Sequence, residues 1–145
     1  MRGARQRGVT LVEVLVTLIV ISVGLLGVAA LQAISIRDNY SAYLRSQATA
    51  LADDMIDRIR ANRDNASSYV VSLTGTLSGT SRAAVDVTDW KSQLTASLPN
   101  VDASTVANGS ISVTPIGSGR FSVRIVIKWG ERNTSGFQFS TTSEV

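Results

Sequence analysis

The chain has 145 residues, no cysteine, no histidine and a formal net charge of +3. This length accommodates one small domain and one hydrophobic segment, and without cysteine the domain relies on its core rather than on a disulfide. The two missing residue types include the commonest general base and major metal ligands. We therefore expect no enzymatic activity, no cofactor and no metal site.

The excess of positive charge is confined to the N-terminus, where Arg2, Arg5 and Arg7 precede the hydrophobic segment. Without residues 1–8, the 14 basic residues fall by three to 11, which equals the 11 acidic residues. The remainder of the chain is thus neutral, and its charge gives no reason to expect a nucleic-acid partner.

A long hydrophobic segment, residues 9–31, follows Gly8 and contains a single charge, Glu13. Its uncharged part, residues 14–31, is close to the ~20 residues that a helix needs to cross a bilayer. The preceding arginines place the N-terminus in the cytoplasm by the positive-inside rule. A cleaved secretory signal, with a weak site at residues 27–29, is the alternative.

Glu13 is the most informative residue of this segment. A charge within a membrane-length apolar run costs roughly 2.5–3.5 kcal/mol on insertion scales, so we expect it to have a functional partner. The alternative is a carboxylate at the cytoplasmic interface that reaches water.

Helical periodicity continues beyond the hydrophobic segment, and we predict one helix over residues 9–62, about 80 Å long. One face of its second half is apolar: Tyr40, Leu44, Ala48, Leu51, Ala52, Met55, Ile56 and Ile59. The opposite face carries Asp53, Asp54 and Asp57 close to several arginines. These neighbours favour a salt-bridged surface over a metal site.

The C-terminal part alternates between loops, a short helix and strands. We predict a short strand at 69–73, a loop at 74–82, and a helix at 86–98 with Thr88 or Asp89 as its cap. Period-two patterns predict strands at 110–114, 120–129 and 137–140, with a turn at 117–119. Trp90 and Trp129 are expected in the core. The elements predict an α+β fold in which the long helix covers a three-stranded antiparallel meander.

The N-terminal motif resembles that of type IV prepilins: a basic leader that ends in Gly8, then a hydrophobic helix with Glu13 as its fifth residue. The resemblance implies a pilin fold and cleavage between Gly8 and Val9 by a prepilin peptidase that also methylates the Val9 amine. It implies that Glu13 pairs with the N-terminal amine of a neighbouring subunit during assembly. The chain then divides into a leader (1–8), a transmembrane half-helix (9–31) and a periplasmic domain (32–145).

Three stretches and one strand resemble PilV-type minor pilins, also called type IV pilus modification proteins: residues 23–27, 30–32 and 51–62, and the strand that ends in Trp129. That resemblance implies a place in the priming or tip complex that initiates pilus assembly, with roles in adhesion and twitching motility. The implied partners are the peptidase, the major pilin, other minor pilins, the inner membrane and, as a further candidate, a tip adhesin. The protein would be in the inner membrane and then in the pilus at the cell surface.

Two other functions remain open at this point. A minor pseudopilin of a type II secretion system would share the N-terminal motif. A membrane-anchored periplasmic binding module belongs to another class and would keep its N-terminus or lose it near Ala29.

Overall fold

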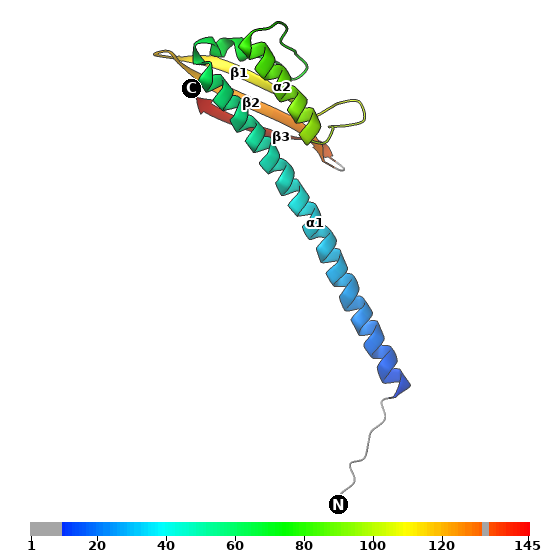
Figure 1. Ribbon diagram of the computed structural model, residues 1–145. Helices are drawn as coiled ribbons and strands as arrows, with labels where there is room; N and C mark the ends of the chain where they lie inside the picture. Colours follow the sequence, from blue (N-terminus) through cyan, green and yellow to red (C-terminus); the bar gives the residue numbers. More distant parts are fainter. Residues whose placement is uncertain (1–9, 132–133) are drawn as a thin grey trace, which may run out of the picture. The chain divides into compact units, whose positions relative to one another are not determined.

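The computed structural model describes residues 10–131 and 134–145 of the chain. It divides into two compact units, Met1–Tyr40 and Ser41–Val145. Helix α1 (Leu11–Ala61) runs through the described part of the first unit and into the second (Figure 1). The predicted single helix is confirmed, at about 77 Å long from its 51 residues.

In the first unit, every described residue is exposed. The other described residues therefore do not bury the apolar side chains of this unit. In the second unit, α1 buries one stripe of six side chains: Leu44, Ala48, Ala52, Met55, Ile56 and Ile59. Tyr40, which the sequence placed in the stripe, is 54% exposed and belongs to the first unit, so the core face begins at Leu44.

A three-stranded antiparallel sheet forms the other layer of the second unit. Its strands lie in the order β1 (Asn108–Gly117), β2 (Arg120–Glu131) and β3 (Thr134–Glu144), which confirms the predicted meander. Gly117 and Gly119 adopt positive φ at the β1–β2 turn, where residues without a side chain are least strained. The inward side chains of β2, from Val123 to Trp129, are buried in one core with the α1 stripe.

A second helix also covers the sheet: α2 (Arg82–Ser97) buries Val87, Trp90 and Leu94 in the same core (Figure 1). The sequence analysis named only the long helix as cover for the sheet, and α2 is a second cover that it missed. Trp90 nevertheless lies where it was expected, because it is fully buried, as is Trp129.

The start of α2 differs from the prediction. The helix begins at Arg82, four residues before the predicted start, and its cap is Ser81, whose hydroxyl oxygen accepts from the Ala84 N–H at 3.2 Å. Thr88 lies inside the helix and donates to the Ala84 carbonyl. The first turn of α2 lacks the apolar spacing of a helix. Its good helix formers and its serine cap are enough to start the helix four residues earlier than predicted.

The predicted strand at 69–73 is also wrong. Residues Arg63–Tyr69 form a short 3-10 helix, η1, and only Val71 pairs with the sheet, through an isolated bridge to Ile111. The Tyr69 hydroxyl finds its partners on the helices, which keeps this residue out of an extended ladder.

Candidate functional site

The N-terminal turn of α1 is the first candidate site. Gly8 and Val9, the predicted cleavage and methylation residues, lie outside the described residues. Thr10 precedes the helix, and its hydroxyl and carbonyl oxygens both accept from the Glu13 N–H, at 3.3 and 3.1 Å. A threonine followed three residues later by glutamate is a helix-start pattern, and the sequence analysis missed it.

The Glu13 carboxylate lies on the surface of the first helical turn. The residue is exposed, and within residues 10–131 and 134–145 its side chain has no ion-pair or hydrogen-bond partner. Its place in the first helical turn is favourable because the N-terminal end of a helix carries partial positive charge. That effect is typically 0.3–1 kcal/mol at an exposed site, too little to offset burial of the charge in apolar surroundings.

Helix α1 is long and apolar enough to cross a membrane, with mean hydropathy 2.8 over its most apolar window. The only polar side chains among residues 14–31 are Thr17 and Ser22. Both hydroxyls donate at 2.6 Å to the carbonyl oxygen four residues earlier, in Glu13 and Leu18. Their hydrogen-bonding capacity is thus met within the helix, as an apolar environment requires.

The acidic face of α1 is a salt-bridged surface. Asp54 pairs with Arg58 and Asp57 with Arg60, each at 2.8 Å. Asp53 is exposed on the same face. The arginines pair with Asp54 and Asp57 as the sequence predicted, and surface pairs of this kind contribute about 0–1 kcal/mol each.

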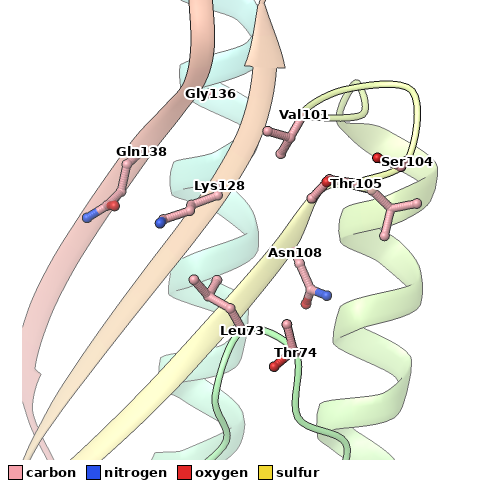
Figure 2. A pocket seen from close by; sticks show the side chains of 10 residues that line it. Leu73, Thr74, Val101, Ser104, Thr105, Asn108, Lys128, Gly136 and Gln138 are labelled. Carbon is pink, nitrogen blue, oxygen red and sulfur yellow. The ribbon is translucent and has the colours of Figure 1, made fainter.

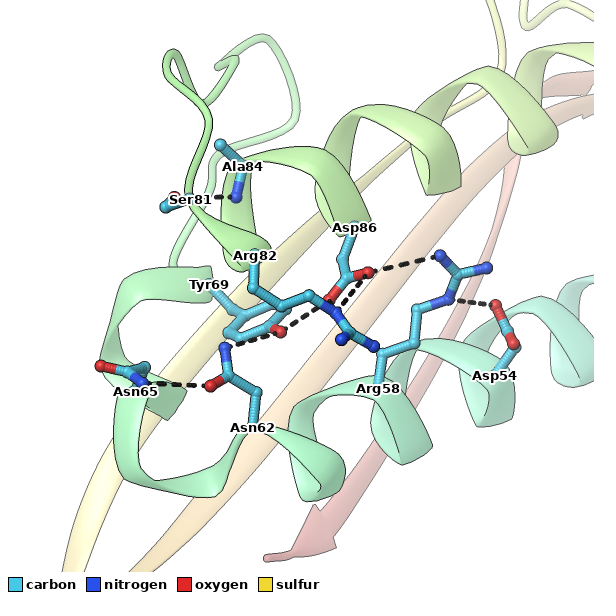
Figure 3. A network of polar contacts seen from close by, with 9 residues as sticks. All are labelled: Asp54, Arg58, Asn62, Asn65, Tyr69, Ser81, Arg82, Ala84 and Asp86. Atoms are coloured by element: carbon cyan, nitrogen blue, oxygen red, sulfur yellow. Dashed lines mark hydrogen bonds and ion pairs between the residues drawn. The ribbon is translucent and has the colours of Figure 1, made fainter.

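A buried polar network joins the end of α1 to η1 and α2 (Figure 3). Asp86 is 5% exposed and accepts from the Tyr69 hydroxyl at 2.7 Å and from Arg82 at 3.1 Å, with Arg58 at 3.6 Å. Burial, with Asp86 alongside, raises the pKa of the Tyr69 hydroxyl. The Tyr69 hydroxyl and the Asp86 carboxylate both have partners, so the network fixes the three elements together.

Comparison with known proteins identifies the class. The chain belongs to the Tt1218-like family: the profile described as type IV pilin Tt1218 matches residues 30–103, about half of its length. A second profile, the prokaryotic N-terminal methylation motif, matches residues 3–29, which include Gly8, Val9 and Glu13. Neither the curated proteins nor the solved structures give a significant match.

The family and the fold agree. A long N-terminal helix packed on a small antiparallel sheet is the pilin architecture that the sequence predicted. The methylation motif thus covers the start of α1, and the type IV pilin profile covers the rest of α1 and the domain up to residue 103.

Proposed function

We propose that this chain is a minor pilin of a type IV pilus, cleaved after Gly8 and assembled through the N-terminal half of α1. The proposal rests on Glu13. Its carboxylate is exposed, has no partner among the described residues, and lies in the first turn of an otherwise uncharged apolar half-helix. The match of the N-terminal methylation motif over residues 3–29 supports processing at this position by a prepilin peptidase, with methylation of the Val9 amine.

Before processing, residues 9–31 cross the inner membrane once, with the arginine-rich leader in the cytoplasm. Residues 32–145 then form the periplasmic domain. The exposed apolar surface of residues 10–40, the two self-satisfied hydroxyls and the positive leader support this placement.

In the assembled filament, we assign Glu13 to a charge pair with the N-terminal amine of a neighbouring subunit. Packing of apolar half-helices removes water from around the carboxylate, and an unpaired charge there is costly. Cleavage creates a positive amine on Val9, and a neighbour shifted along the filament axis can bring it to Glu13. One pair of complementary charges then fixes the register between subunits.

The likeness of residues 23–27 and 51–62 to PilV-type minor pilins supports a place in the priming or tip complex. Its partners there are other minor pilins, the major pilin and, at the outermost position, a tip adhesin, and its role serves adhesion and twitching motility. Co-purification of the tagged protein with pilus components supports this place, and co-purification with type II secretion components assigns it instead to the pseudopilins.

The assembly role is tested with four variants: Glu13→Ala, Glu13→Gln, Glu13→Asp and Thr10→Ala. Both neutral variants should be inserted, cleaved at least in part and folded, yet strongly reduced in sheared pilus fractions. Glu13→Asp should retain part of the incorporation because it keeps the charge. Thr10→Ala weakens the helix start while it keeps the carboxylate, so it controls for loss of helix stability.

Quantitative immunoblots of membrane and sheared fractions separate the outcomes. Wild-type incorporation of Glu13→Gln excludes charge pairing for this subunit. A defect in Thr10→Ala as large as that in Glu13→Ala assigns the effect to the helix start instead.

A further inference from the structure

The face of the sheet turned away from the core carries ordered rows of polar side chains. On β2 the inward residues are Val123, Ile125, Ile127 and Trp129, so the alternate residues face outward. The pairing register places Asn108, Lys128 and Gln138 side by side, one from each strand. An amide, an ammonium and a second amide thus form one cross-strand row.

This row is the floor of a groove of about 740 Å³ (Figure 2). One wall comes from the loop before α2, with Leu73 and Thr74. The other comes from the loop after α2 and consists of Val101, Ser104, Thr105 and Val106. Val106 contributes an apolar side chain that is 42% exposed. The volume is within the roughly 300–1,000 Å³ that is typical of ligand sites, and none of the described residues that line the groove is aromatic.

The first wall is held in place by Lys91 of α2. Its ammonium donates to the carbonyl oxygens of Ser72, Leu73 and Gly75, at 3.0, 3.1 and 2.6 Å. Burial lowers the pKa of Lys91. Three bonds from one cation give this loop a defined position over β1.

The second wall is held by Asp102. Its carboxylate oxygen accepts from the Ser104 N–H, the Ser104 hydroxyl and the Thr105 N–H, each at 2.8 Å. These bonds lower the pKa of Asp102 to about 2. Behind this loop, the Gly130 N–H donates to the Pro99 carbonyl at 3.1 Å, and a side chain on Gly130 would collide with Asn100. The groove is therefore formed before any ligand enters it.

Lys128 lies between these walls. In the part of the chain that the structure describes, its ammonium has no ion-pair or hydrogen-bond partner, and no acidic residue lines the groove. The residue is half-buried, so its charge is less screened than that of an exposed lysine. An anionic group that enters the groove would gain a charge-assisted hydrogen bond here.

We propose that this groove binds an acidic segment of a partner protein, with a Glu or Asp carboxylate on Lys128. The amides of Asn108 and Gln138 can donate to and accept from the peptide backbone on either side of that carboxylate. Leu73, Val101 and Val106 supply apolar surface for neighbouring aliphatic side chains. The absence of an aromatic platform among the lining residues favours a peptide over an acidic sugar ring. This inference does not depend on the assembly role of Glu13.

The test uses the full chain in non-ionic detergent micelles. The probe is a hexapeptide of glutamate, capped at both ends so that the side chains carry its only charges. Backbone amide shifts in NMR spectra should change at residues 73–74, 101–106, 128 and 138. The dissociation constant from the same titration should rise at least about tenfold in Lys128→Gln, as expected for loss of a hydrogen bond to a charged group.

Arg124→Gln is the matched control, because Arg124 is an exposed cation on the same outward face of β2. It should change the dissociation constant by less than about twofold, as expected for a screened surface charge. Capped hexaglutamine should not bind.

Three results overturn the proposal. One is the absence of shifts at the groove with hexaglutamate. Another is an equal loss of affinity in Arg124→Gln and Lys128→Gln, which identifies non-specific attraction. The third is binding of a glucuronate oligosaccharide at this groove in place of hexaglutamate, which assigns the site to acidic saccharides.

Discussion

The indole N–H of Trp90 donates to the backbone carbonyl oxygen of Leu51 across 2.9 Å, and so ties α2 directly to α1. On its other side the same ring fills the space above Gly109 in β1. A Cβ built on Gly109 would lie 2.3 Å from the Trp90 ring. One fully buried side chain thus fixes the spacing of two helices and a strand.

Gly109→Ala should therefore destabilise the domain by about 1–3 kcal/mol, because the buried ring has no free space to move into. The measurement is thermal or denaturant unfolding of the full chain in detergent. Ser110→Ala, one residue further along β1 on the outward face, should cost less than about 0.5 kcal/mol. In a Trp90→Leu background the extra cost of Gly109→Ala should shrink. A cost that is unchanged in that background contradicts the packing explanation.

Met55→Asp should cost about 4 kcal/mol or more, because it places an unpaired charge in the core that α1 shares with the sheet. Met55 is completely buried, whereas Asp53 lies on the exposed face two residues earlier. Asp53→Asn is accordingly the control and should change the unfolding free energy by about 0.5 kcal/mol or less. Equal melting temperatures for wild type and Met55→Asp would show that the stripe is not the core face.

Acid should weaken the loop at residues 101–105. The pKa of Asp102 is about 2 in the folded protein against an ordinary value of 3.8. A lowered carboxyl pKa stabilises the fold above the ordinary value, and this contribution is lost as the pH falls through the window from 3.8 to about 2. Asp102→Asn should flatten the stability profile in that window, as measured by unfolding at a series of pH values. An unchanged acid slope in the variant rules out this linkage.

Gly8→Leu should block removal of the leader and keep the protein in the inner membrane. A glycine allows the backbone to enter a protease cleft without a side-chain clash, whereas leucine does not. Intact mass after co-expression with a prepilin peptidase gives the result directly. Gly3→Leu makes the same substitution inside the leader, five residues upstream, and should leave processing intact. Normal processing of Gly8→Leu refutes the assigned cleavage position.

Patterns that repeat along the chain made much of the fold predictable. The alternation from Phe121 to Trp129 requires a half-buried strand, and the apolar spacing from Leu44 to Ile59 requires one helical face. The N-terminal motif needs no tertiary contact to be read, because Gly8 and Glu13 are neighbours in sequence.

Features that depend on distant contacts were missed. Residues 69–73 have the composition of a strand, but the Tyr69 hydroxyl donates to Asp86, 17 residues away. The groove was invisible for the same reason: Asn108, Lys128 and Gln138 become neighbours only through strand register. The Thr10 and Ser81 caps depend on no distant contact, because each side chain accepts from the backbone N–H three residues later.

The fastening of residues 72–75 by Lys91 has a consequence for how this domain responds to its surroundings. A loop that is held by a disulfide is released when the disulfide is reduced, but this chain contains no cysteine. Its loop is instead held by the Lys91 ammonium, which donates hydrogen bonds to three backbone carbonyl oxygens. Reductants should leave it closed, whereas acylation of that amine would release it and open one side of the groove.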